Sequence, residues 1–175
     1  NASIYGVTPS YETVKNVTVE QWIFITENNY KMRDKVAIIW PTIVSNLFPD
    51  WDAIGKTIRV GTTLFTVVGI TKTSWNSDNI IYIPLSTAQI TISGTPYLSS
   101  IFVSVASADL MTSVQADIQE NLLKSLGKTV DTMNFQIQNQ ADMLDTASSI
   151  TTMLKAFLGW VAAISLIVGG IGVMN

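Results

Sequence analysis

The motif of this chain that most clearly suggests a chemical function is the tripeptide Gly-Lys-Thr, which occurs at residues 55–57 and 127–129. The same tripeptide ends the phosphate-binding loop of many nucleotide-binding proteins. That loop also needs a glycine five positions before the second one, and here those positions hold Asp50 and Leu122. It must follow a strand and open a helix, so that backbone N–H groups surround the phosphates. The first tripeptide instead leads into a strand pattern and the second follows a helix pattern. Neither is therefore predicted to bind a nucleotide.

A second candidate is an acidic turn with a glycine, formed by Asp50, Asp52 and Gly55. This spacing weakly resembles the first positions of a calcium-binding loop. The EF-hand loop needs further oxygen ligands and a glutamate at its twelfth position. Counted from Asp50, that position is Gly61. A surface turn is the better interpretation, and no metal site is predicted.

The composition removes most of the remaining enzyme chemistry. The chain has no histidine and no cysteine, so it lacks the commonest general base, the thiolate nucleophile and the favoured zinc ligands. Its net charge is −3, with 13% charged residues and no basic run, which argues against a nucleic-acid partner. The predicted catalytic, cofactor-binding and metal-binding residues are therefore none.

The last twenty residues, 156–175, carry no charged side chain. As a helix they would extend roughly 28 Å, close to the thickness of a bilayer. Lys155 precedes the run and could extend to the lipid headgroups, and Trp160 lies near the polar end, where membrane helices often carry aromatics. We therefore expect the start of a transmembrane helix here. A buried C-terminal helix of a globular protein is the alternative, although such apolar runs are commonly only about 10–14 residues long.

Small residues recur within this apolar run. Ser165 and Gly169 have the small-xxx-small spacing that lets membrane helices approach closely, and Gly170 and Gly172 add further small positions. No strand pattern precedes these glycines, so they do not form a dinucleotide-binding fingerprint. We predict that these four residues pack the transmembrane helix against another helix.

The part of the chain before residue 97 is rich in strand patterns. Apolar and β-branched runs occur at 3–7, 35–40, 55–60, 63–70 and 79–85. The third and fourth are separated by a short turn and are typical of a hairpin. Pro41 opens a short helical segment over 42–48.

The pattern then changes to strand–helix–strand, with expected strands at 100–106 and 133–138. Between them, residues 109–126 form an amphipathic helix pattern with an apolar residue every fourth position, which we expect to be buried against a sheet. The stripe consists of Leu110, Val114, Ile118, Leu122 and Leu126. A final helix should begin near Gln140 and continue into the apolar run.

The order of these segments resembles the extracytoplasmic domain of MacB-type ABC transporter permeases, which are related to the FtsX-like permeases. The most specific match is AAISLIVGGIGVMN at 162–175, which resembles the start of the second membrane helix of that family. The other matches are YGVTPSY (5–11), KVAIIW with NLF (35–40, 46–48), IGKTIRV with FTVVGI (54–60, 65–70), DNIIYIPLST (78–87) and FQIQNQADML (135–144).

The resemblance implies an α+β fold with two subdomains. Residues 1–96 would form a β-rich, Sabre-like insertion, and residues 97–140 the second half of a porter-like α+β unit. Residues 141–155 would be a stalk helix, and residues 156–175 the start of the transmembrane helix. Strands 100–106 and 133–138 would then lack some of their partners within this chain.

The resemblance also implies a function without catalysis in this chain. ATP would be the cofactor of a partner ATPase domain or subunit, and the permease would carry motion across the membrane to residues 1–155 on the extracytoplasmic side. The implied partners are the cell membrane, the ABC ATPase and a second permease in a homodimer. A membrane-anchored extracytoplasmic binding or sensing module without a transport role remains the alternative.

Overall fold

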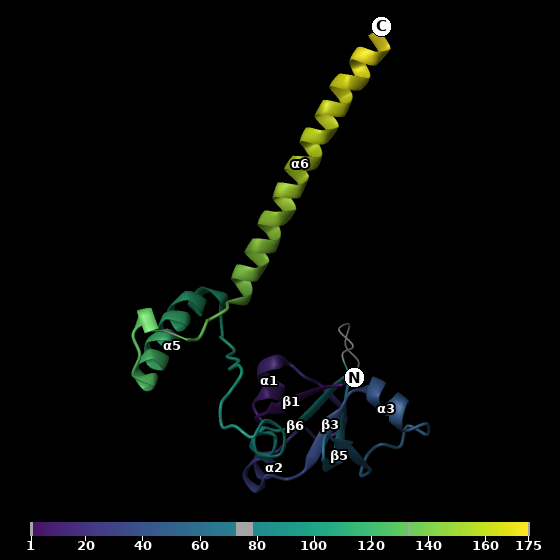
Figure 1. The fold of residues 1–175 in the computed structure, drawn as a ribbon, viewed down its shortest axis with the longest axis vertical. Helices are drawn as coiled ribbons and strands as arrows, with labels where there is room; N and C mark the ends of the chain where they lie inside the picture. Colours follow the sequence, from purple (N-terminus) through teal and green to yellow (C-terminus); the bar gives the residue numbers. More distant parts are fainter. Residues whose placement is uncertain (1, 73–78, 133, 175) are drawn as a thin grey trace. The chain divides into compact units, whose positions relative to one another are not determined.

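The computed structural model describes residues 2–72, 79–132 and 134–174 (Figure 1). The chain divides into two compact units, Asn1–Ser104 and Val105–Asn175. The first unit contains a mixed sheet with short helices, and the second contains two longer helices. The fold is therefore α+β, as the sequence predicted.

The first unit is built on one sheet, which has six strands among the described residues, in the order β1-β6-β3-β5-β2 with β4 paired to β5. The pairs β1–β6 and β3–β5 are parallel, and β3–β6, β2–β5 and β4–β5 are antiparallel. The strands are β1 (Ser3–Val7), β2 (Val19–Trp22), β3 (Val36–Ile39), β4 (Thr57–Val60), β5 (Thr63–Thr71) and β6 (Ile80–Pro84). Strands β4 and β5 form the hairpin expected from the sequence.

Short helices connect these strands, namely α1 (Tyr11–Lys15), α2 (Glu27–Met32), α3 (Pro41–Leu47), α4 (Leu85–Ala88) and the π-helical turn η1 (Gln89–Ser93). Helix α2 begins with a capping box, in which the Asn29 N–H donates to Thr26 Oγ1 and the Thr26 N–H donates to Asn29 Oδ1. Helix α3 begins with Pro41, whose fixed φ suits the first helical position.

Strand β3 is buried on both of its faces, and this explains its unbroken apolar sequence. Successive side chains of a strand point to opposite faces of the sheet. Ile39 accordingly packs in one buried cluster with Val44, Phe65 and Ile83. Ile38 packs in the other cluster, which contains Phe24, Trp40 and Tyr82. Both faces of the sheet are therefore covered at the position of β3.

The second unit contains α5 (Met111–Leu126) and α6 (Gln140–Met174), with single 3-10 turns η2 (Ala108–Leu110) and η3 (Val130–Thr132). Gly127 ends α5 in a left-handed conformation with φ of 62°, which glycine adopts without steric cost. The Lys128 N–H then donates to the Leu123 carbonyl oxygen at 2.9 Å and satisfies one of the last carbonyls of the helix.

The predicted strands that flank α5 are wrong for this structure. Residues 100–106 and 134–138 form no strand, and Met133 lies outside the described residues. A strand is stabilised by hydrogen bonds to a neighbouring strand, and the described residues provide none beside these segments. The chain alone therefore does not complete the expected strand–helix–strand unit.

The prediction that the α5 stripe is buried is also wrong. Leu110 and Leu126 are 50% and 51% exposed, and Val114, Ile118 and Leu122 are only half-buried. The physical reason is the same, because an amphipathic helix buries its apolar face only where another element covers it. Among the described residues of the second unit there is no strand to provide that cover.

Two buried threonines of the first unit provide a matched test of its hydrogen bonding. Thr71 is 1% exposed and its Oγ1 has no partner among the described residues, whereas Thr87, 2% exposed, donates its Oγ1 to the Asp34 carbonyl oxygen at 2.9 Å. Thr71→Val should raise the free energy of unfolding by about 1 kcal/mol, because an unpaired buried hydroxyl is costly. Thr87→Val should lower it by about 1–2 kcal/mol, since the Asp34 carbonyl loses its donor.

Urea denaturation of both variants, followed by tryptophan fluorescence, measures this difference. Equal losses of stability in the two variants would contradict the assignment of Thr71 as an unpaired group.

Candidate functional site

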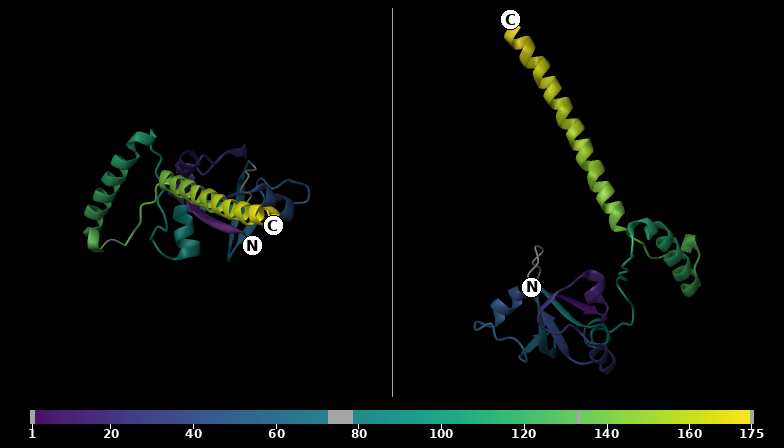
Figure 2. Two further views of the ribbon diagram at one scale, coloured as in Figure 1. Left: turned by 90° about the horizontal axis from the view of Figure 1, so that it is seen from above. Right: turned by 180° about the vertical axis from the view of Figure 1, so that it is seen from behind.

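Helix α6 is the longest element of the chain, with 35 residues from Gln140 to Met174 (Figures 1 and 2). At 1.5 Å per residue it is roughly 52 Å long, which is more than a bilayer core requires. Its sequence begins with interspersed polar residues and becomes apolar after Lys155. A single continuous helix therefore joins a polar segment to an apolar one, as the sequence predicted.

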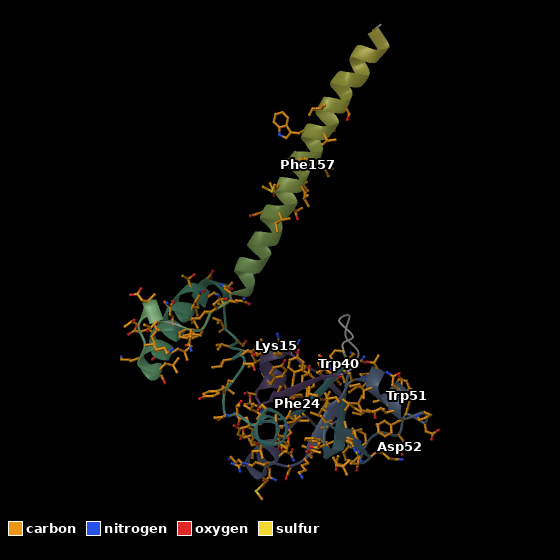
Figure 3. The ribbon with its side chains drawn as sticks, in the orientation of Figure 1. Lys15, Phe24, Trp40, Trp51, Asp52 and Phe157 are labelled. Atoms are coloured by element: carbon orange, nitrogen blue, oxygen red, sulfur yellow. The ribbon has the colours of Figure 1, made fainter. Side chains whose placement is uncertain are left out.

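The segment Ser148–Ser165 of α6 is long and apolar enough to cross a membrane, and none of it is buried in the protein. Lys155 is its charged residue. Two large aromatic side chains, Phe157 (Figure 3) and Trp160, are exposed on it. A buried core helix was the alternative interpretation of this run, and the lack of burial does not support it.

Two hydroxyl groups of this segment are hydrogen-bonded within the helix. Thr152 donates its Oγ1 to the Ser148 carbonyl oxygen at 3.0 Å, and Ser165 donates its Oγ to the Val161 carbonyl oxygen at 2.8 Å. In lipid every polar group needs a partner within the protein. These back-bonds provide one for each hydroxyl, so both residues are compatible with an apolar environment.

The four predicted packing residues all belong to α6. Ser165 is exposed in this chain. The structure does not describe the surroundings of Gly169, Gly170 and Gly172. The structure thus places these residues on one helix, and their packing role stays a prediction.

The two Gly-Lys-Thr tripeptides have neither the position nor the geometry of a phosphate-binding loop. Gly55 precedes β4, and Gly127 ends α5, so neither opens a helix. The Lys56 ammonium is engaged by the Asp52 carboxylate, with an Nζ–Oδ2 distance of 3.3 Å. No group of three or more potential metal-ligating side chains occurs in the part of the chain that the structure describes.

The sequence did not predict a groove that the structure forms within the first unit. The groove has a volume of about 490 Å³ and is bounded by β1, α1, α4, η1 and the extended segment 97–102. Apolar and aromatic side chains dominate its lining, and they include Tyr5, Tyr11, Ile92 and Phe102. These residues lie far apart in the sequence, so no spacing pattern could have predicted it.

Aromatic rings gather at one wall of this groove. The Tyr11 ring lies 5.7 Å from the Tyr82 ring and 5.8 Å from the Phe102 ring, between centroids. The Lys15 ammonium lies 4.6 Å from the centroid of Phe102, a cation–π contact. Burial raises the pKa of the Tyr11 phenol, and Coulombic interaction with Tyr82 and Tyr5 raises it further. The phenol therefore remains a hydrogen-bond donor to a higher pH than an exposed tyrosine does.

Fold and helix together define an α+β domain joined to a candidate membrane span. The family model of the MacB-like periplasmic core domain matches residues 1–121. This chain therefore belongs to the MacB-like periplasmic core domain family.

Sequence relatives agree with this assignment. The chain is 33% identical over 172 residues to a macrolide export ATP-binding/permease protein MacB of Azoarcus sp. (strain BH72), covering 95% of the chain and 26% of the relative. It is 34% identical over 182 residues to the protein of the same name from Hyphomonas neptunium, covering 100% of the chain and 28% of the relative. The chain thus spans only about a quarter of the length of these relatives.

Two solved structures share the fold. The periplasmic region of MacB from Actinobacillus actinomycetemcomitans superposes with a TM-score of 0.73 at 23% identity, over 84% of this chain and 65% of that one. The extracellular domain of the ABC-type transporter YknZ from Gram-positive bacteria gives 0.66 at 23% identity, over 73% and 66%. At this identity the likeness supports the fold alone.

The position of the two tripeptides leads to a prediction about ATP. Titration calorimetry of the purified chain with Mg-ATP should give no saturable heat, because neither lysine adjoins a helix N-terminus that could hold a phosphate. Lys56→Ala and Lys128→Ala should leave the titration unchanged. A micromolar affinity that either substitution abolished would contradict this prediction.

Proposed function

We propose that this chain is the extracytoplasmic part of an ABC transporter permease that couples cytoplasmic ATP hydrolysis to export or mechanical work outside the membrane. The observation that carries the proposal is the continuity of α6, since a domain of the MacB-like family leads into one unbroken 35-residue helix. The names of the relatives, which join ATP binding, a permease and export, support the same conclusion.

The helix suits this role because of how it is held together. An α-helix is stiff along its axis, since every interior N–H is bonded to a carbonyl one turn away. A helix that is partly polar before Lys155 and apolar after it suits water in its first part and lipid in its second. Motion at the membrane end of such a rod is transmitted to its other end.

The proposed partners are those that membership of the family implies. The apolar part of α6 lies in the cell membrane, and residues 1–155 are extracytoplasmic. ATP is bound and hydrolysed by a separate ATPase domain or subunit, and two permeases form a homodimer. The relatives are named for macrolide export, which makes a macrolide the first substrate to test.

A membrane-anchored binding or sensing module is the second candidate function. The groove in the first unit favours it, since a module that only binds a ligand also needs such a site. The two functions differ in one respect, because only a transporter part requires α6 to be rigid.

Proline at position 149 tests the lever. Ser149 lies inside α6 and is exposed. Ser149→Pro removes a backbone hydrogen bond and clashes with the preceding turn, at a local cost of about 3 kcal/mol. In the full-length transporter we expect export to fall severalfold while the ATPase rate is retained, measured together in proteoliposomes with a macrolide as substrate.

Ser149→Ala is the matched control, because alanine favours the helix and should leave both rates unchanged. Normal export by the proline variant would argue against the lever and in favour of a simple anchor.

The packing role of the small residues is tested at Gly169. Gly169→Leu adds bulk where a close approach between helices is proposed, so disulfide crosslinking between engineered cysteines in the membrane helices of the two permeases should decrease severalfold. Val168→Leu adds a smaller bulk at the neighbouring position and should leave the crosslinking near the wild-type level. The same decrease in both variants would show that bulk anywhere on the helix, not packing at Gly169, is responsible.

A further inference from the structure

We propose that the groove of the first unit binds a neutral amphipathic small molecule, with an apolar body and hydroxyl or carbonyl groups. This inference goes beyond the function proposed above and does not rest on it. All lining residues lie between Ile4 and Phe102, within one compact unit, so the groove is complete without the second unit.

The size of the groove suits a small molecule. Ligand pockets in proteins are commonly about 300–1,000 Å³ in volume, and mostly apolar with a few polar groups. The groove, at about 490 Å³, falls within this range. One side of the groove is held tightly, because a Cβ on Gly6 would lie 2.5 Å from the Ala88 Cβ, so only glycine allows β1 and α4 to approach this closely.

The charge of the groove decides between ligand classes. None of the described residues that line it carries a formal charge. The Lys15 ammonium contacts the Phe102 ring from beside the groove and is not part of its lining. A charged group on the ligand would be desolvated in the groove without a partner of opposite sign, at a considerable cost. A neutral ligand avoids that cost.

The polar groups of the lining are uncharged hydroxyls, phenols and one amide, and some of them are already hydrogen-bonded. Thr8 Oγ1 and Ser10 Oγ are 3.0 Å apart, and Gln89 donates its Nε2 to the Pro96 carbonyl oxygen at 2.9 Å. The hydroxyl oxygens can still accept a further hydrogen bond. The protonated Tyr11 phenol can donate one, which suits a carbonyl or hydroxyl oxygen of the ligand.

Aromatic side chains provide flat apolar walls. The Tyr11 and Phe102 rings meet edge to face at an interplanar angle of 80°, so they form two sides of a corner. Tyr5 extends this wall on β1, with its ring 6.2 Å from that of Tyr82. Such rings bury a large apolar area per side chain and so favour an apolar or aromatic ligand body.

Two fluorescent probes of matched shape test the proposal. N-phenyl-1-naphthylamine is neutral, and 8-anilinonaphthalene-1-sulfonate carries the same aromatic skeleton with a sulfonate. The full chain in lipid nanodiscs is titrated with each probe, and the signal of empty nanodiscs is subtracted. The neutral probe should bind saturably with one site per chain, and the anionic probe at least about tenfold more weakly, which corresponds to about 1.4 kcal/mol.

Two isoleucines on η1 form a matched pair for locating the site. Ile92 lines the groove and is 44% exposed, whereas Ile90 does not line it and is 59% exposed. Ile92→Trp should fill the groove and lower the affinity for the neutral probe at least about tenfold, and Ile90→Trp should change it less than about twofold. Leu98→Trp fills the groove from the opposite, extended segment and should act like Ile92→Trp without touching the sheet.

Several results would overturn the proposal. These are the absence of a saturable site for the neutral probe, tighter binding of the anionic probe, or equal affinities in the Ile92→Trp and Ile90→Trp variants. A dimer in size-exclusion chromatography that both Ile92→Trp and Leu98→Trp dissociate would show instead that a second copy of the chain occupies the groove.

Discussion

The fold of the first unit depends on one constraint, which is that β3 must be shielded from water on both faces. Its two isoleucines belong to different buried clusters, Ile39 to one and Ile38 to the other. A strand in that position needs neighbours on both edges and cover on both faces. The sheet provides β5 and β6 as neighbours, while α3 contributes Val44 to one cluster and the segment after β2 contributes Phe24 and Ile25 to the other.

No comparable constraint holds the second unit together among the described residues. Helix α5 buries no side chain completely, and α6 exposes large apolar side chains such as Phe157 and Trp160. In water such a continuous apolar surface is unfavourable and marks a site of contact with lipid or protein. A bilayer would cover the apolar part of α6, as the function proposed above requires.

The sequence predicted the elements that owe their stability to strong local patterns. The apolar runs of β3, β5 and β6, the hairpin of β4 with β5, the C-terminal end of α5 and the continuity of α6 all correspond to the pattern of their own residues. The strands at 100–106 and 133–138 were predicted from equally good alternation. They fail because a strand depends on a partner, which no local pattern supplies. The groove could not be predicted either, because it also depends on contacts between distant parts of the sequence. Tyr11, Ile92 and Phe102 are brought together only by tertiary packing.

The two proposed roles of the chain are physically separable, and this bears on how such a domain would work. The groove is built from residues that end at Phe102, whereas the lever begins at Gln140. A ligand in the groove can change the position of α6 only if it binds one conformation of the protein more tightly than another, because a ligand that binds all conformations equally shifts none of them.

The groove has two walls that differ in how firmly the sheet holds them. One is fixed to the sheet by β1 and α4, which meet closely at Gly6 and Ala88. The other is segment 97–102, which pairs with no strand among the described residues and is therefore less constrained by the sheet. Phe102 is the last residue of the groove along the chain, and its contacts with Tyr11 and Lys15 hold this end of the segment against α1. A substitution at Phe102 is accordingly the place to look for an effect of a bound ligand on the rest of the chain.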